Sequence, residues 1–130
     1  MSNHHKNPAI PPAHAVVTLQ GNSRQIYGFT AFPLAAPVRG AGVCIFVRPP
    51  DEPGAFSPNW WIPLYVVGAD NLSDNSAIPH GIPEQAQRMG ATHLLVHFCN
   101  RGEDARRAIA EDLVAVLQPP LNTEERRAAA

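Results

Sequence analysis

Two apolar, β-branched runs separated by a proline-rich segment constrain the fold more than any other feature of the sequence. Residues 42–48 read Gly-Val-Cys-Ile-Phe-Val-Arg, and this unbroken apolar character is typical of a strand covered on both faces. Residues 49–59 are rich in proline and cannot form a regular element. The second run, 60–67, follows directly. Because the two runs are joined locally, we expect them to pair as antiparallel strands.

The second run leads into a polar segment and predicts a strand-to-helix corner within residues 60–75. Its extended character ends at Gly68, and the side chains that follow are those that cap helices: Asp70, Asn71, Ser73 and Asp74. Binding and catalytic sites are often built at such corners. We therefore expect a helix near residues 71–75 and a candidate site beside it.

The remaining sequence predicts short elements on both sides of this centre. Runs 15–19 and 26–32 flank a Gly-Asn pair, which is typical of a hairpin. A short helix is expected at 82–90, where Pro83 falls in the first turn and Gly90 lies beyond the end. Run 91–99 follows as a strand whose predicted core face is made by Leu94, Val96 and Phe98.

The last predicted helix begins at Glu103 or Asp104 and ends at Leu117, before two prolines. We expect Arg106, Arg107 and Glu111 on its far side, with Ala110 at the edge of its apolar stripe. The predicted stripe is made by Ala105, Ile109, Leu113, Val116 and Leu117.

A chain of 130 residues with 14 prolines favours a single loop-rich domain. We expect a flexible tail at 1–14, the domain at 15–122 and a C-terminal fringe at 123–130. The predicted fold is α+β (a layered α/β arrangement), with a small, mainly antiparallel sheet of three to five strands and about three flanking helices.

The charge and the cysteine content limit the classes of function that the sequence allows. The net charge is −1 with a pI near 6.6, so no overall field attracts nucleic acid or an anionic membrane. No apolar run reaches membrane-spanning length. Cys44 and Cys99 lie far apart in apolar runs, without a Cys-x-x-Cys spacing, which favours buried reduced thiols in a cytoplasmic protein.

The order of several short motifs resembles the GIY-YIG nuclease superfamily, specifically its small stand-alone bacterial members. The resemblance covers roughly residues 27–122. It is carried by Gly42-Val43-Cys44, Tyr65-Val66-Val67, Asn71-Leu72-Ser73-Asp74-Asn75, Gly90-Ala91-Thr92-His93 and the final Leu113 to Pro119-Pro120-Leu121-Asn122. Each motif alone is weak, whereas their order and spacing together are fairly specific.

The resemblance implies a small antiparallel sheet flanked by helices and, in active members, phosphodiester hydrolysis with one Mg²⁺ or Mn²⁺ ion. Two tyrosines, a helix arginine and a glutamate carry out that chemistry in the family. At the matching positions this sequence has Cys44 for the first tyrosine, retains Tyr65 for the second, and has Asn75 for the arginine. The glutamate position, counted back from Leu113, Pro119 and Asn122, falls on Ala110 rather than on Glu111. A degenerate active site is therefore expected.

Our leading hypothesis is a catalytically inactive nuclease-like domain that acts as a binding module for nucleic acid (DNA or RNA) or for a protein partner, without a cofactor. Arg39, Arg48 and Arg88 could line a nucleic-acid-binding cleft, or they could be scattered surface residues that aid solubility.

Two other function classes stay open. An active metal-dependent endonuclease could use a rearranged site made by Tyr65, His80 and Glu111, because an imidazole can act as a base. Metal binding could involve His93, His97 and Cys99, which share one face of a predicted strand. Of the adjacent Trp60 and Trp61, only one can point into the core, and the other could contact a partner.

Overall fold

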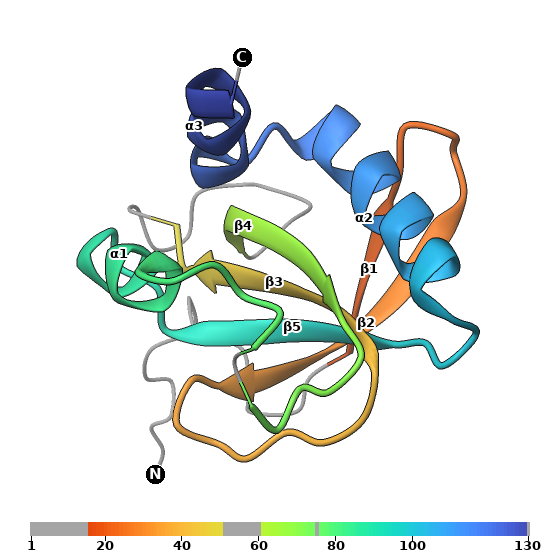
Figure 1. Cartoon of the computed structure of the whole chain (residues 1–130), viewed down its shortest axis with the longest axis horizontal. Coiled ribbons are helices and arrows are strands. Elements are labelled where there is room, and N and C mark those ends of the chain that lie inside the picture. The colour runs from red at the N-terminus through yellow and green to blue at the C-terminus, as the bar shows by residue number, and fades with distance from the viewer. Residues whose placement is uncertain (1–15, 51–60, 75, 130) are drawn as a thin grey trace, which may run out of the picture.

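The protein forms one antiparallel β-sheet with three helices, in a computed structural model that describes residues 16–50, 61–74 and 76–129 (Figure 1). The elements in chain order are β1 (Val16–Gln20), β2 (Ile26–Pro33), β3 (Gly42–Arg48), β4 (Ile62–Ala69), α1 (Ile82–Arg88), β5 (His93–Phe98), α2 (Glu103–Leu117) and α3 (Pro120–Ala129). The strand order is β1-β2-β5-β3-β4 and every neighbouring pair is antiparallel. The predicted α+β fold class is confirmed.

Both predicted hairpins are present. β1 pairs with β2 across the turn at Gly21 and Asn22, and β3 pairs with β4, with a register shift between Phe46 and Val47. β5 inserts between β2 and β3, so it is the central strand and β4 is an edge strand. The connecting loop expected at 49–59, together with Trp60, falls mostly outside the described residues.

The sheet is covered on both faces. One core cluster packs the sheet against α2 and includes Phe29, Ile45, Leu95, Ile109 and Leu113. A second cluster joins Phe46, Leu64 and Tyr65 to α1 through Ile82 and Ala86, and to α3 through Leu121. Within the described residues, no helix has the length and apolar character needed to cross a membrane.

The helix expected near residues 71–75 is absent from the described positions 71–74, which form turns, and Asn75 lies outside the described residues. The side chain of Asn71 accepts hydrogen bonds from both the backbone N–H and the hydroxyl of Ser73. Asp74 does the same for Ser76. These local bonds offer the backbone an alternative to helix formation, so the residues interpreted as helix caps form turns instead.

Residues 123–129, which the sequence analysis assigns to a C-terminal fringe, belong to the helix α3. Pro120 opens this helix, a position where a proline's missing N–H costs nothing. Arg126 and Arg127 lie in its last turn, where positive charge is favourable. Leu121 and Asn122 are buried, so the helix is anchored to the sheet through its first turn.

The bounds of α2 agree with the sequence prediction, but its buried face is rotated. Ile109 and Leu113 are buried as expected, whereas Val116 is 46% exposed and Val114 is buried in its place. Arg106 was expected on the far side and is only 7% exposed. The face that packs on the sheet follows positions 106, 109, 110, 113 and 114, a regular helical spacing.

The core face predicted for β5 is only partly right. Val96 is buried, but Phe98 is 50% exposed. Leu95 and Cys99, on the opposite face, belong to the core beneath α2. A central strand that packs on both sides has no single polar face. The alternation of side chains along β5 therefore identified only some of its buried residues.

Candidate binding groove

A groove of about 420 Å³ lies along the edge strand β4, between α2 and α3. This space, here called the β4 groove, has residues 65–68 of β4 on one side. The helix α2 contributes Arg106, Arg107, Ala110 and Glu111, and α3 contributes Asn122, Glu125 and Arg126. In Figure 1, β4 lies beside α2 and below α3. The volume of the β4 groove falls within the range of small-ligand sites.

Asn122 holds α3 against the free edge of β4. Its Oδ1 accepts a hydrogen bond of 2.7 Å from the backbone N–H of Val66, and its Nδ2 donates one of 2.9 Å to the carbonyl of the same residue. An edge strand presents unpaired backbone groups at alternate residues. The amide of Asn122 therefore makes at Val66 the two bonds that a neighbouring strand would make.

Gly68 presents the next outward-facing backbone groups of β4. It lies two residues beyond Val66 in an unshifted part of the register, so its N–H and carbonyl point to the same side. Among the described residues, neither group has a hydrogen-bond partner. An ideal Cβ at this position would lie 3.1 Å from Cβ of Arg106, and glycine therefore lets α2 approach the strand closely.

Tyr65 connects β4 to α3 at the other end of the groove. Its hydroxyl donates a hydrogen bond of 2.8 Å to Oε2 of Glu125. Burial raises the pKa of Tyr65 well above its ordinary value, and the hydrogen bond to Glu125 and the charge of this carboxylate raise it further. The phenol is therefore neutral at physiological pH, and its hydroxyl is already hydrogen-bonded to Glu125.

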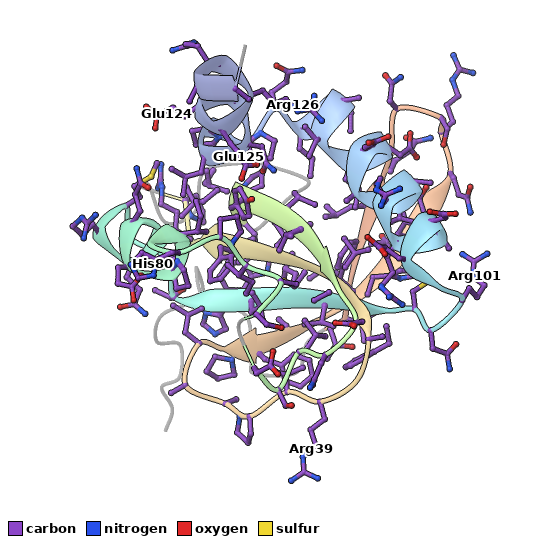
Figure 2. The ribbon with its side chains drawn as sticks, viewed as in Figure 1. Arg39, His80, Arg101, Glu124, Glu125 and Arg126 are labelled. Atoms are coloured by element: carbon purple, nitrogen blue, oxygen red, sulfur yellow. The ribbon has the colours of Figure 1, made fainter. Side chains whose placement is uncertain are left out.

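The groove carries charges of both signs. Three arginines from the helices face it together with four carboxylate side chains, which are Asp70, Glu103, Glu111 and Glu125. Arg107 is bound to Glu103 at 3.0 Å and to Asp104 at 3.2 Å, so its charge is already paired. Figure 2 shows Glu125 and Arg126 on α3. Among the lining residues that the structure describes, the mixture of signs leaves no continuous positive surface.

The structure brings together only part of the degenerate site that the family resemblance implies. Tyr65 and Ala110 both line the β4 groove. Cys44 has no exposed surface and packs against Val38 and Val96. Burial raises the pKa of the Cys44 thiol to about 12, so this sulfur is a protonated core group.

The rearranged site is also only partly assembled. Tyr65 and Glu111 line the same groove, and Glu111 is exposed as the sequence suggested. His80 is exposed in the turn before α1 and does not line the groove. In Figure 2 it lies beside α1, away from α2 and from Glu125.

The three arginines singled out from the sequence do not gather in one cleft. Arg39 is exposed in the loop between β2 and β3, at the end of the molecule opposite α3 in Figure 2. Arg48 ends β3, and its Cδ would lie 3.3 Å from a Cβ placed on Gly90. Arg88 ends α1. The arginines of the β4 groove are different residues.

His93, His97 and Cys99 have separate surroundings. The ring of His93 packs on the core residue Trp61 with centroids 4.6 Å apart. Nδ1 of His97 donates a hydrogen bond of 2.8 Å to the carbonyl of Gly28. Cys99 is buried as a free thiol. In the part of the chain that the structure describes, no three histidine, cysteine or acidic side chains lie close enough together to hold a metal ion.

Sequence reasoning missed three residues that shape the groove: Arg106, Asn122 and Glu125. Arg106 precedes Ile109 by three residues and Leu113 by seven, which is the spacing of the buried face, so its burial was detectable in the sequence. Asn122 served only as a counting point within the family resemblance. Nothing in the sequence signals that Glu125 meets Tyr65, because α3 itself was not expected.

Comparisons with protein-family models, with curated proteins and with solved structures found no match to this chain.

Proposed function

We propose that this chain is a nuclease-like domain of GIY-YIG type that no longer cuts nucleic acid and that binds a short polypeptide segment in the β4 groove. The observation that carries this proposal is the state of the β4 edge. Asn122 pairs with Val66 as a strand would, while the N–H and carbonyl of Gly68 stay open toward the groove. An extended peptide can pair with such open groups by adding to the sheet.

The charge distribution favours a polypeptide over nucleic acid. Nucleic acid binding relies on Lys and Arg side chains that neutralise several phosphates along a positive surface. The groove places carboxylates such as Glu111 and Glu125 among its arginines, and a phosphate backbone would meet both signs. A polypeptide offers neutral backbone groups and few charges, which suits this lining.

Two residues of the groove and one residue of the core support a loss of nuclease chemistry. The hydroxyl of Tyr65 is neutral and bonded to Glu125. Ala110 has no group that could bind a metal ion, and Cys44 is enclosed in the core. Hydrolysis of a phosphodiester needs an activated nucleophile and a countercharge for the developing negative charge.

Selection of random peptides displayed on phage against the purified protein tests the proposal. We expect enriched peptides to bind saturably and to shift the backbone amide NMR signals of Val67, Gly68 and Ala69. The substitution Ala110→Trp fills the groove and should weaken binding about tenfold or more. Ala108→Trp is the matched control, because Ala108 is exposed on α2 and does not line the groove. Peptides whose binding maps elsewhere, or equal effects of both substitutions, would contradict the proposal.

A metal-dependent endonuclease remains the second candidate, because Tyr65 and Glu111 line the same groove. Incubation with supercoiled DNA or with RNA in the presence of Mg²⁺ or Mn²⁺ distinguishes the two functions. Cleavage that requires the metal and is lost in both Tyr65→Phe and Glu111→Gln would favour the enzyme. Our proposal expects no cleavage above that of a buffer control.

A further inference from the structure

The helix α3 is held to the rest of the protein mainly through its first turn. Its buried residues are Leu121 and Asn122, whereas residues 124–129 are all exposed. Hollows lie on two sides of the helix. One is the β4 groove, and the other, of about 420 Å³, lies between α3 and the residues Gln85 and Met89 in and next to α1. A helix with few buried contacts can open locally while the core stays folded.

The connection between α2 and α3 is short and strained. Only Gln118 and Pro119 separate the two helices. Gln118 has φ 51° and ψ 54°, a left-handed conformation that residues with a side chain rarely adopt. When elements move relative to each other, a few residues at their ends absorb the backbone rotation. Gln118 therefore lies where a hinge for α3 is expected.

The contact of α3 with β4 occupies backbone groups that an added strand would use. The amide of Asn122 bonds both the N–H and the carbonyl of Val66, at 2.7 and 2.9 Å. Outward-facing groups of an edge strand recur at every second residue, and the next pair belongs to Gly68, which has no partner among the described residues. A polypeptide can therefore pair with Gly68 while α3 is in place, but it can pair with Val66 only after Asn122 has left.

We propose that α3 is an autoinhibitory clasp, which opens so that an extended polypeptide can pair with Val66 as well as with Gly68. This inference rests on the proposed function and specifies how access to the β4 edge is regulated. The polypeptide begins to pair at Gly68 and replaces Asn122 as it extends to Val66. Opening thus raises the outward-facing backbone pairs available to the ligand from one to two.

Two further contacts hold the clasp closed when no ligand is bound. Leu121 is 4% exposed and packs in the core cluster that contains Leu64 and Tyr65. One turn later, Glu125 accepts the hydrogen bond of the Tyr65 hydroxyl at 2.8 Å. Glu125 makes this contact from the exposed part of the helix. Its removal should therefore loosen the clasp without creating a cavity in the core.

Native-state hydrogen exchange followed by NMR measures the opening without any ligand. The N–H of Val66 is bonded to Asn122, so its exchange reports the population of the open clasp. Leu95 is the internal reference, because it lies in the central strand β5 with a paired strand on each side. We expect the protection factor of Val66 to be about 100-fold lower than that of Leu95.

Three variants test the role of the latch between Tyr65 and Glu125. Glu125→Ala should speed the exchange of Val66 about fivefold, as expected for the loss of one hydrogen bond, and should leave Leu95 unchanged. Tyr65→Phe removes the same bond from the other partner and should have an equal effect. Glu124→Ala is the matched control, since Glu124 is the exposed neighbour that lines the hollow on the α1 side.

Peptide affinity links the opening to binding. A ligand that binds the open form has an apparent affinity proportional to the open fraction. The phage-selected peptides should therefore bind Glu125→Ala and Tyr65→Phe about fivefold more tightly than wild type, the same factor by which Val66 exchange rises. Glu124→Ala should bind them as wild type does. An equal gain in both latch variants excludes a direct contact of the peptide with Glu125 as the cause.

The outcomes separate this inference from the proposed function. A Val66 N–H as strongly protected as that of Leu95 overturns the clasp, whatever the peptides do. If selected peptides map to Gly68 but bind wild type and both latch variants equally, the groove function stands and the clasp inference fails. If Val66 opens locally while no selected peptide maps to the β4 edge, the polypeptide function fails, and the clasp, which then guards no such site, fails with it.

Discussion

Asp112 joins the first hairpin to α2 at the scale of a single side chain. Its Oδ2 accepts hydrogen bonds of 2.7 Å from the hydroxyls of Ser23 and Tyr27, and its Oδ1 accepts one of 2.8 Å from the backbone N–H of Ser23. Gly21 lies so close that an added Cβ would collide with this carboxylate. The hydrogen bonds, that from the Ser23 hydroxyl foremost, lower the pKa of Asp112 below its ordinary value of 3.8.

This lowered pKa makes the contribution of Asp112 to stability pH-dependent. Because the folded-state pKa lies below the unfolded value, the stabilisation is complete above the unfolded pKa and is lost as the pH falls through the folded one. We expect Asp112→Asn to lower the melting temperature at pH 7, with the gap from wild type narrowing below about pH 4. Thermal unfolding from pH 7 to pH 2 measures the gap. Asp104→Asn, whose carboxylate is exposed, is the control, and a gap for Asp112→Asn that is independent of pH would contradict the assignment.

Restoring the first tyrosine of the family pattern should disturb the fold. Cys44 has no exposed surface, so a phenol in its place must displace packed neighbours such as Val96. We expect Cys44→Tyr to lower the free energy of unfolding by about 1–3 kcal/mol or more. Ala110→Glu, at the half-buried groove wall, should cost less because its carboxylate can extend into the groove. Urea denaturation compares the two variants, and an equally stable Cys44→Tyr protein would show that the site can expand.

The sequence identified elements better than it identified the faces they bury. The strands and the bounds of α2 follow from local patterns of apolar residues, prolines and glycines, which act over a few positions. The orientation of α2 depends on tertiary packing that a sequence can fit in more than one way, and the prediction therefore chose Val116 over Val114. The turn at Asn71 and Asp74 failed for another reason, because residues that cap helices also form turns.

The buried face of α2 differs from the one expected from the sequence, and two valines of this helix test the difference. Val114 is 6% exposed and packs in the core beneath the helix, while Val116 faces solvent. We expect Val114→Ala to lower the free energy of unfolding by about 2 kcal/mol, through lost burial and a small cavity. Val116→Ala should change it by no more than about 0.5 kcal/mol. Urea denaturation of both variants measures the difference, and a larger loss for Val116→Ala would support the helix orientation expected from the sequence.

At the scale of the whole molecule, the two edge strands of the sheet have different surroundings. β1 ends the sheet on one side, and β4 ends it on the other, beside α2 and below α3 in Figure 1. The groove could not be found from the sequence, because it depends on α3 and on where Asn122 meets Val66, residues 56 positions apart. Contacts between such distant residues leave no local pattern. Of the candidate residues that the structure describes, only Tyr65, Ala110 and Glu111 line this groove.

Removal of the amide at Asn122 should open the β4 edge. In Asn122→Ala the N–H and carbonyl of Val66 lose their partners, and we expect the free energy of unfolding to fall by about 2 kcal/mol or more. An uncovered edge can also pair with the edge of another copy, so the variant should self-associate as its concentration rises. Urea denaturation and sedimentation velocity measure the two effects. Glu124→Ala is the control, since Glu124 is exposed on the same helix. A monomeric Asn122→Ala protein of unchanged stability would mean that the amide does not hold α3 on the strand.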